Sequence, residues 1–167
     1  MANIIDAIIN LIKNPVIELN DEYINKKNRA NSMGEALEEY VKDLFANSMG
    51  VTDENKRLDL INENFSYLGN QNNPPDAILK YGDAIEVKKI ESPNSSLALN
   101  SSYPKAQLFS NSKMITNACR ICEPQEIYDA SESSAENQQY WIEKDIIYVV
   151  GVVKKSKLSS LVMVYGC

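Results

Sequence analysis

The feature that most constrains the fold is an apolar run in the last quarter of the sequence. Residues 146–153 read Ile-Ile-Tyr-Val-Val-Gly-Val-Val, with β-branched side chains at most positions and no charge. A strand with one face in water alternates apolar and polar residues, whereas a strand covered on both faces reads as a continuous apolar run. We therefore expect a central strand over residues 145–153, covered on both faces.

The rest of the sequence supplies helices and further strands to surround that strand. Apolar spacing predicts a helix over residues 3–13, which Asn14-Pro15 ends. It also predicts a second helix, with apolar residues between positions 33 and 45 and with Asn31 or Ser32 as its N-terminal cap. Two more helices with polar faces are expected at residues 20–29 and 53–64, and strands at residues 65–68 and 158–165. The expected fold class is α/β, with a mixed β-sheet core flanked by helices.

Length and composition favour one soluble domain. A chain of 167 residues can bury roughly 70% of its unfolded surface, which is enough for one core. We expect a cytoplasmic protein, because no apolar run is long enough to span a bilayer and no signal peptide is recognisable. The three cysteines, Cys119, Cys122 and Cys167, lack the further ligands of a structural zinc site, so reduced, partly buried thiols are expected.

The sequence contains no histidine, which excludes several kinds of chemistry. Ser-His-Asp and Cys-His nucleophile systems, His-ligated zinc hydrolases and nucleases with an active-site histidine all need this side chain. Neither a Gly-x-x-x-x-Gly-Lys phosphate loop nor a Gly-x-Gly-x-x-Gly turn is present. Carboxylates and lysines remain as the groups that can carry catalysis.

One segment brings carboxylates and a lysine together. Residues 75–88 read Pro-Asp-Ala-Ile-Leu-Lys-Tyr-Gly-Asp-Ala-Ile-Glu-Val-Lys, which predicts strands at 77–81 and 84–89 joined at Gly82. A tight antiparallel hairpin would place Asp76 beside the second strand, where Glu86 and Lys88 point to the same side. An ordinary exposed hairpin with Glu86 and Lys88 as same-face partners is the plainer interpretation.

These residue types suit phosphodiester hydrolysis at a hard cation. Mg²⁺ prefers oxygen ligands, so Asp76 and Glu86 are the expected ligands, with the Val87 carbonyl as a further oxygen. Lys88 cannot bind metal, but its ammonium can orient or activate water and stabilise charge on phosphate oxygens. A lysine can also lower its pKa when it is desolvated and then take part in proton transfer.

The pattern Asp76, Glu86 and Lys88 resembles the active-site signature of the PD-(D/E)xK nuclease superfamily. In that superfamily an N-terminal helix often carries Gly-x-x-x-Glu, whose Glu joins the metal site, and Gly34 with Glu38 matches this spacing. The resemblance implies a metal or supporting role for Glu38. For Glu35 and Glu39 we expect a solvated helix face.

A polar segment after the hairpin extends the resemblance. Residues 91–105 are rich in Ser, Asn and Pro, and Leu-Asn-Ser-Ser-Tyr-Pro-Lys at 99–105 looks like the Type II restriction endonucleases of the NgoPII kind, which cut GGCC. Side chains of this segment can read base edges or bind phosphate, although it also fits a plain linker. The expected DNA-binding residues are Lys89, Asn94, Asn100, Ser101, Ser102 and Lys105.

Together these features predict a Mg²⁺-dependent Type II site-specific deoxyribonuclease that cuts double-stranded DNA to leave 5′-phosphate ends. The resemblance implies GGCC as the site, a homodimer, since a two-fold protein matches a palindrome, and a cognate DNA methyltransferase as functional partner. It also implies one endonuclease domain over residues 1–167 that is truncated at its C-terminal end relative to the family. The alternatives are a repair or recombination nuclease of the same superfamily and a catalytically inert fragment that acts as a binding module.

Net charge is −6, which is unusual for a DNA-binding protein, because contacts to phosphate dominate affinity. The distribution of charge is uneven, however. Residues 77–125 hold 6 basic and 4 acidic side chains, whereas residues 1–76 hold 7 and 13, and residues 126–167 hold 4 and 6. The single segment with positive net charge therefore contains the hairpin and the Ser/Asn-rich loop.

Overall fold

The computed structural model describes residues 2–26, 32–70, 75–97, 107–109, 111–112, 116, 118–119 and 141–166. Within these ranges the chain forms three α-helices, α1 (Ile4–Lys13), α2 (Met33–Ala46) and α3 (Glu54–Asn64), and the π-helix η1 (Asn20–Lys26). The strands are β1 (Phe65–Tyr67), β2 (Ala77–Leu79), β3 (Ala84–Ile90), β4 (Gln107–Leu108), β5 (Lys144–Lys154) and β6 (Lys157–Val164).

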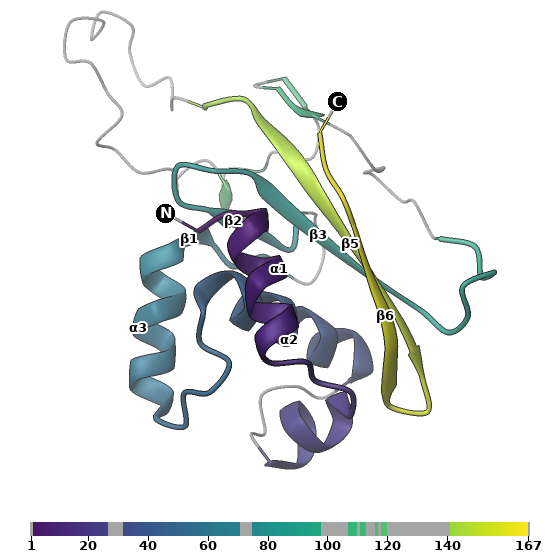
Figure 1. Ribbon diagram of the computed structural model, residues 1–167. Coiled ribbons are helices and arrows are strands. Elements are labelled where there is room, and N and C mark those ends of the chain that lie inside the picture. The colour runs from purple at the N-terminus through teal and green to yellow at the C-terminus, as the bar shows by residue number, and fades with distance from the viewer. Residues whose placement is uncertain are drawn as a thin grey trace, which may run out of the picture.

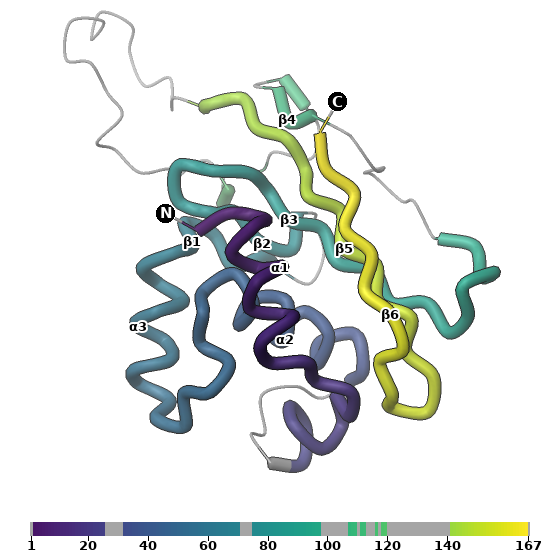
Figure 2. The backbone as a smooth tube through the Cα atoms, viewed as in Figure 1, coloured from purple at the N-terminus to yellow at the C-terminus, as the bar shows by residue number. Residues whose placement is uncertain are grey.

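The strands form a mixed sheet with β5 in its interior (Figure 1). The order is β1-β2-β3-β5-β4, and β6 also pairs with β5. β3 runs parallel to β5, with Ile85 opposite Ile147, and the other pairs are antiparallel. Figure 2 shows the long path of β5 beside β3 and β6. Every residue from 146 to 153 is buried, which confirms the predicted central strand.

The described helices lie on one face of this sheet (Figure 1). Alternate strand residues, including Ile85, Val87, Ile147 and Val149, pack against α1, α2 and η1 in the larger core cluster. The residues between them point to the opposite face, where Ala84, Ile146, Tyr148 and Val150 pack with Leu108 and Trp141. Both faces of β5 are therefore covered, as an apolar run without alternation requires.

Local sequence explains where each helix begins. The Asn3 side chain accepts hydrogen bonds from the backbone of Ile5 and Asp6, and the Asp6 carboxylate accepts one from the Asn3 N–H in return. Ser32, rather than Asn31, caps α2 by accepting from the Glu35 N–H. Asp53 caps α3 in the same way. These side chains satisfy backbone donors that have no partner inside the helix.

Close contact between α2 and β5 fixes the helix on the sheet. A Cβ at Gly151 would lie 2.6 Å from one methyl carbon of Leu37, which is shorter than real Cβ contacts allow. The glycine in the middle of the central strand therefore makes room for a core leucine of α2. This contact sets the distance between the sheet and the helix that carries Glu38.

A buried ionic network joins α2 to α3. The Arg57 guanidinium, 4% exposed, lies 2.7 Å from the Asp43 carboxylate and 2.6 Å from that of Glu39. Asp43 also accepts hydrogen bonds from the hydroxyls of Ser48 and Tyr23. The expectation that Glu39 belongs to a solvated helix face is wrong, because its carboxylate pairs with this buried arginine. Sequence spacing alone did not distinguish such a residue from a surface glutamate.

Several sequence predictions are refined or fall outside the described residues. The segment expected as a helix at 20–29 is a π-helix over Asn20–Lys26, and residues 27–31 lie outside the described residues. Cys119 is a buried free thiol, as expected, whereas Cys122 and Cys167 lie outside the described residues. In the part of the chain that the structure describes, no helix is both long and apolar enough to cross a membrane.

Candidate active site

The β2–β3 hairpin brings Asp76 to the backbone of β3. Ala77 pairs with Ile85 and Ile78 with Ala84, so Asp76, one residue before β2, lies beside the start of the Glu-Val-Lys segment. Its Oδ2 accepts a hydrogen bond of 2.6 Å from the Val87 N–H. The predicted approach of Asp76 to the second strand is therefore present in the structure.

Glu86 and Lys88 form an ion pair on one face of β3. The Lys88 Nζ lies 2.7 Å from Glu86 Oε1, and the side chains are 25% and 3% exposed respectively. Glu86 stands opposite the fully buried Tyr148 in the parallel β3–β5 pair. The pair is far less exposed than the plainer interpretation of an open surface hairpin would require.

The charge state of Lys88 differs from the sequence expectation. Burial alone lowers the pKa of this ammonium, but the hydrogen bond and negative charge of Glu86, together with the charge of Asp76, more than offset it. The pKa of Lys88 is therefore raised above its ordinary value, and the side chain stays protonated at neutral pH. Lys88 as it stands can donate hydrogen bonds and positive charge, whereas it is poorly suited to accept a proton.

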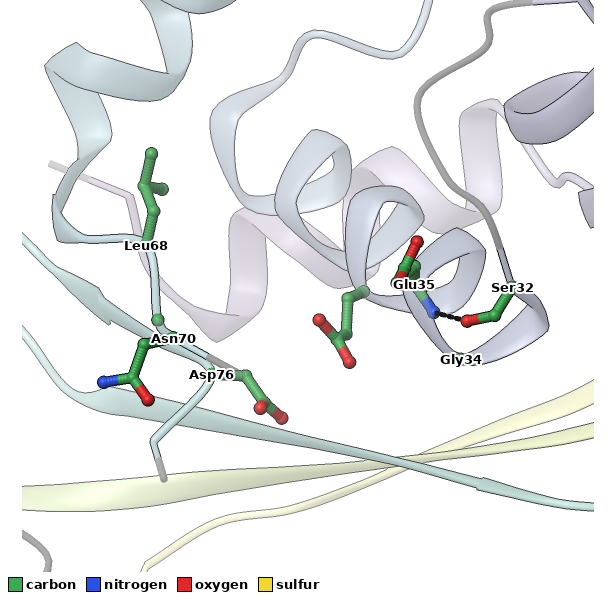
Figure 3. A pocket seen from close by; sticks show the side chains of 8 residues that line it. Ser32, Gly34, Glu35, Leu68, Asn70 and Asp76 are labelled. Atoms are coloured by element: carbon green, nitrogen blue, oxygen red, sulfur yellow. Dashed lines mark hydrogen bonds between the residues drawn. The ribbon is translucent and has the colours of Figure 1, made fainter. Parts of the chain in front are cut away.

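Asp76 and Glu38 line one pocket of about 440 Å³ between α2 and the loop after β1. Figure 3 shows Asp76, Leu68 and Asn70 across this pocket from Ser32, Gly34 and Glu35. Both residues of the predicted Gly34-x-x-x-Glu38 spacing contribute to its wall. The N-terminal turn of α2 thus faces the residue that begins the hairpin motif.

Both carboxylates in this pocket are costly to ionise. Burial raises the pKa of the Glu38 carboxyl to about 7, and the negative charge of Asp76 adds to the shift. Burial also raises the pKa of Asp76, although the Val87 N–H and the charges of Lys88 and Lys42 oppose it. A cation bound here would favour the ionised form of both carboxylates, because opposite charge offsets the cost of burial.

The loop after β1 is fitted closely to Asp76. Gly69 has φ +81°, and a Cβ at this position would overlap the carbonyl oxygen of Asp76. Asn70 follows, and its Nδ2 lies 2.6 Å from the Tyr67 hydroxyl. A glycine is needed here both for the left-handed backbone and for the close approach of two chain segments. Sequence reasoning missed Gly69, Asn70 and Lys42, because none belongs to the hairpin motif.

The predicted metal ligands are brought near one another in pairs. Asp76 and Glu38 share the pocket, and Asp76 bonds to Val87, next to the Glu86–Lys88 ion pair. Among the described residues no group of three or more His, Cys, Asp or Glu side chains is close enough to hold a metal ion. Glu86 is also absent from the described lining of the pocket.

Most of the predicted DNA-binding residues cannot be placed. Asn100, Ser101, Ser102 and Lys105 lie outside the described residues. Lys89 follows Lys88 on β3, so their side chains point to opposite faces of the strand. The Lys89 ammonium lies 3.7 Å from the Glu91 carboxylate. Asn94 is in the turn that follows β3, where its N–H donates to the Ser92 hydroxyl.

The mixed sheet flanked by helices, with an acidic pocket beside a Glu-x-Lys strand, defines a restriction-endonuclease-like fold. The sequence pattern of the NgoPII restriction endonuclease family matches residues 2–167, and the chain belongs to that family. The Type II restriction enzyme NgoPII of Neisseria gonorrhoeae is 53% identical over 165 residues, which cover 98% of this chain and 53% of the relative. The chain therefore spans about half the length of the curated relative that it matches. No solved structure matches it.

Proposed function

We propose that this chain carries the catalytic domain of a Type II site-specific deoxyribonuclease. The reaction is hydrolysis of a DNA phosphodiester, in which a water oxygen bonds to phosphorus and the bond to the 3′ oxygen breaks. The attacking water loses a proton to solvent and the leaving 3′ oxygen takes one up from solvent, so the products are a 5′-phosphate and a 3′-hydroxyl. The observation that carries the proposal is that Asp76 and Glu38 line one pocket, while Asp76 also accepts from the Val87 N–H of β3 and is influenced by the charge of Lys88.

The donor set fits Mg²⁺. This ion takes oxygen ligands and is commonly held by one or two protein carboxylates, with waters and substrate phosphate completing its shell. Asp76 and Glu38 would supply such carboxylates, and Glu86 and the Val87 carbonyl are the proposed further oxygens. When bound, the cation supplies Lewis acidity at the phosphate and favours ionisation of a water.

The protein side chains have separate tasks in this proposal. Lys88, held in place by Glu86, donates a hydrogen bond and positive charge to a phosphate oxygen or to the attacking water. The Val87 N–H donates to Oδ2 of Asp76 and so fixes the orientation of this carboxylate. The oxygen lone pairs that this hydrogen bond does not use remain available to a cation. Lys89, Asn94, Asn100, Ser101, Ser102 and Lys105 are the proposed contacts to DNA.

We further propose GGCC as the recognition site, because the relative at 53% identity carries the NgoPII name and the Ser/Asn-rich segment resembles that kind of enzyme. A palindromic site favours a symmetric dimer of a single domain spanning residues 1–167. A cytoplasmic location and a methyltransferase that protects the same site complete the proposed restriction-modification role.

The proposal predicts sequence-specific, metal-dependent cutting. Purified chain is incubated with two duplexes of equal composition, one containing GGCC and one with those bases permuted, in Mg²⁺ or in EDTA. We expect cleavage of the GGCC duplex in Mg²⁺ and no cleavage of the permuted duplex or of either duplex in EDTA. The ends should be rejoined by a ligase because they carry 5′-phosphates. Equal cutting of both duplexes would contradict the restriction assignment, and a preference for nicked or branched DNA in a parallel set of substrates would support a repair or recombination nuclease.

A further inference from the structure

Helix α1 presents an apolar stripe to solvent. Ile5, Ile8, Ile9 and Ile12 follow the i, i+3, i+4, i+7 spacing of one helix face, and they are 64%, 41%, 41% and 74% exposed. The opposite face packs on the protein through Ala7 and Asn10, whose Nδ2 donates to the Leu44 carbonyl. A surface helix normally turns its apolar stripe to the core and its polar side to water.

The polar residues of α1 show that this orientation is unusual. Asn10 is 6% exposed, although it is one of three polar residues in the helix. The chain therefore uses a polar side chain to attach α1 to α2 while four isoleucines remain in contact with water. Contiguous exposed apolar side chains of this kind mark interaction sites in soluble proteins.

Charges beside the stripe indicate which surface it fits. Asp6 and Lys13 are seven residues apart, which is two helical turns, so both lie on the same flank of the stripe next to Ile9. When two copies of one helix pack antiparallel, the same flank of each copy meets. Asp6 of one copy then approaches Lys13 of the other, and the opposite pair forms at the other end.

We propose that α1 is a self-association surface, on which α1 of a second copy packs antiparallel about a two-fold axis between Ile8 and Ile9. In this register Ile5 of one copy meets Ile12 of the other, and the two central isoleucines meet across the axis. An isologous interface uses the same surface on both copies, so that surface must be complementary to itself, as this stripe and its flanking charges are. This surface would hold together the dimer of the proposed function, and its role on DNA rests on that proposed function.

The surface is expected to be the apolar centre of the interface rather than its whole area. Ten residues of helix are only about 15 Å long, whereas stable interfaces bury about 800 Å² on each copy. Central apolar residues of an interface carry most of its affinity, and loss of one hot spot weakens binding by about 30-fold or more. Changes at Ile5 and Ile12 should therefore have large effects on association.

The test compares two doubly substituted chains that differ at one position. Ile5→Glu with Ile12→Glu places like charges together in the antiparallel pair, whereas Ile5→Glu with Ile12→Lys places opposite charges together. Sedimentation equilibrium across a concentration series, without DNA or metal, gives the dissociation constant. Leu58→Glu, on the exposed side of α3, is the matched control, and circular dichroism checks the fold.

The expected result is a dimer for the unaltered chain and for Leu58→Glu. The like-charge variant should dissociate at least about 30 times more readily, and the opposite-charge variant should recover most of the association. A monomeric unaltered chain would overturn the proposal, as would equal behaviour of the two double variants. Because cleavage is not measured, failure of this inference is distinguishable from failure of the nuclease assignment.

Discussion

Substitution of Lys88 by alanine is expected to slow DNA cleavage by roughly 10²- to 10³-fold, the usual cost of removing one preorganised donor from a developing charge. The structure keeps Lys88 protonated through Glu86 and Asp76, so the lost group is a fixed positive charge beside the acidic pocket. Single-turnover cleavage of a GGCC duplex in saturating Mg²⁺ measures the effect on chemistry separately from DNA binding.

Two further variants separate catalysis from folding. Lys88→Gln keeps a hydrogen-bond donor for the buried Glu86 but removes the charge, so it should lose activity under conditions in which circular dichroism shows that it is folded. Lys157→Ala removes a lysine that is 66% exposed and paired with Glu18, and it should cut at the unaltered rate. Cleavage by Lys88→Gln at the rate of the unaltered chain would remove Lys88 from the catalytic site.

Substitution of Arg57 by alanine should give the largest loss of stability. Its guanidinium bridges Asp43, which is fully buried, and Glu39, so removal leaves a carboxylate in the core without its cation. Breaking a buried ion pair from one side typically costs about 3–5 kcal/mol. Urea unfolding monitored by circular dichroism should show this change as a lower midpoint with a similar slope.

The neighbouring lysine provides the control for that measurement. Lys56 lies one residue earlier on α3 and is exposed, so Lys56→Ala should change the free energy of unfolding by less than about 0.5 kcal/mol. If Arg57→Ala were no more destabilised than Lys56→Ala, the network would contribute nothing to the junction between α2 and α3.

Features that depend on neighbouring residues were predictable from the sequence. The continuous apolar run at 146–153 identified the central strand, and the β2–β3 hairpin followed from two short apolar segments around Gly82. The sequence offered Asn31 or Ser32 as the cap of α2, because such side chains can accept from backbone N–H groups that lack helical partners, and Ser32 is the residue that caps it. The contact of Asp76 with the Glu-Val-Lys segment followed from the same hairpin geometry.

Features that depend on distant residues were not predictable in this way. The parallel pairing of β3 with β5 joins segments about sixty residues apart, so no local pattern specifies it. The raised pKa of Lys88 needs both the Glu86 ion pair and the charge of Asp76, whereas sequence reasoning considered desolvation alone. Spacing along α2 indicates a surface residue at Glu39, because its arginine partner is on another helix and no local pattern reveals it.

The outward stripe of α1 is a different case. Its apolar spacing correctly predicted a helix, but spacing does not say which side of the helix meets the core. The orientation is set by Asn10, which bonds to the Leu44 carbonyl of α2, and by the packing of Ala7. Prediction of such an interface requires the tertiary structure, because the same four isoleucines would read as core in the sequence.

The central claim is that Asp76 and Glu38 form one site for a hard cation, and direct titration of Mg²⁺ or Mn²⁺ by calorimetry tests it. At pH 8 the unaltered chain should bind, and at pH 6 it should bind more weakly, because Glu38, with a pKa of about 7, must lose its proton. Asp76→Asn should abolish binding, while Asp59→Asn, at an exposed position on α3, should not change it. Absence of binding by the unaltered chain at pH 8, or equal binding by Asp76→Asn, would contradict the assignment.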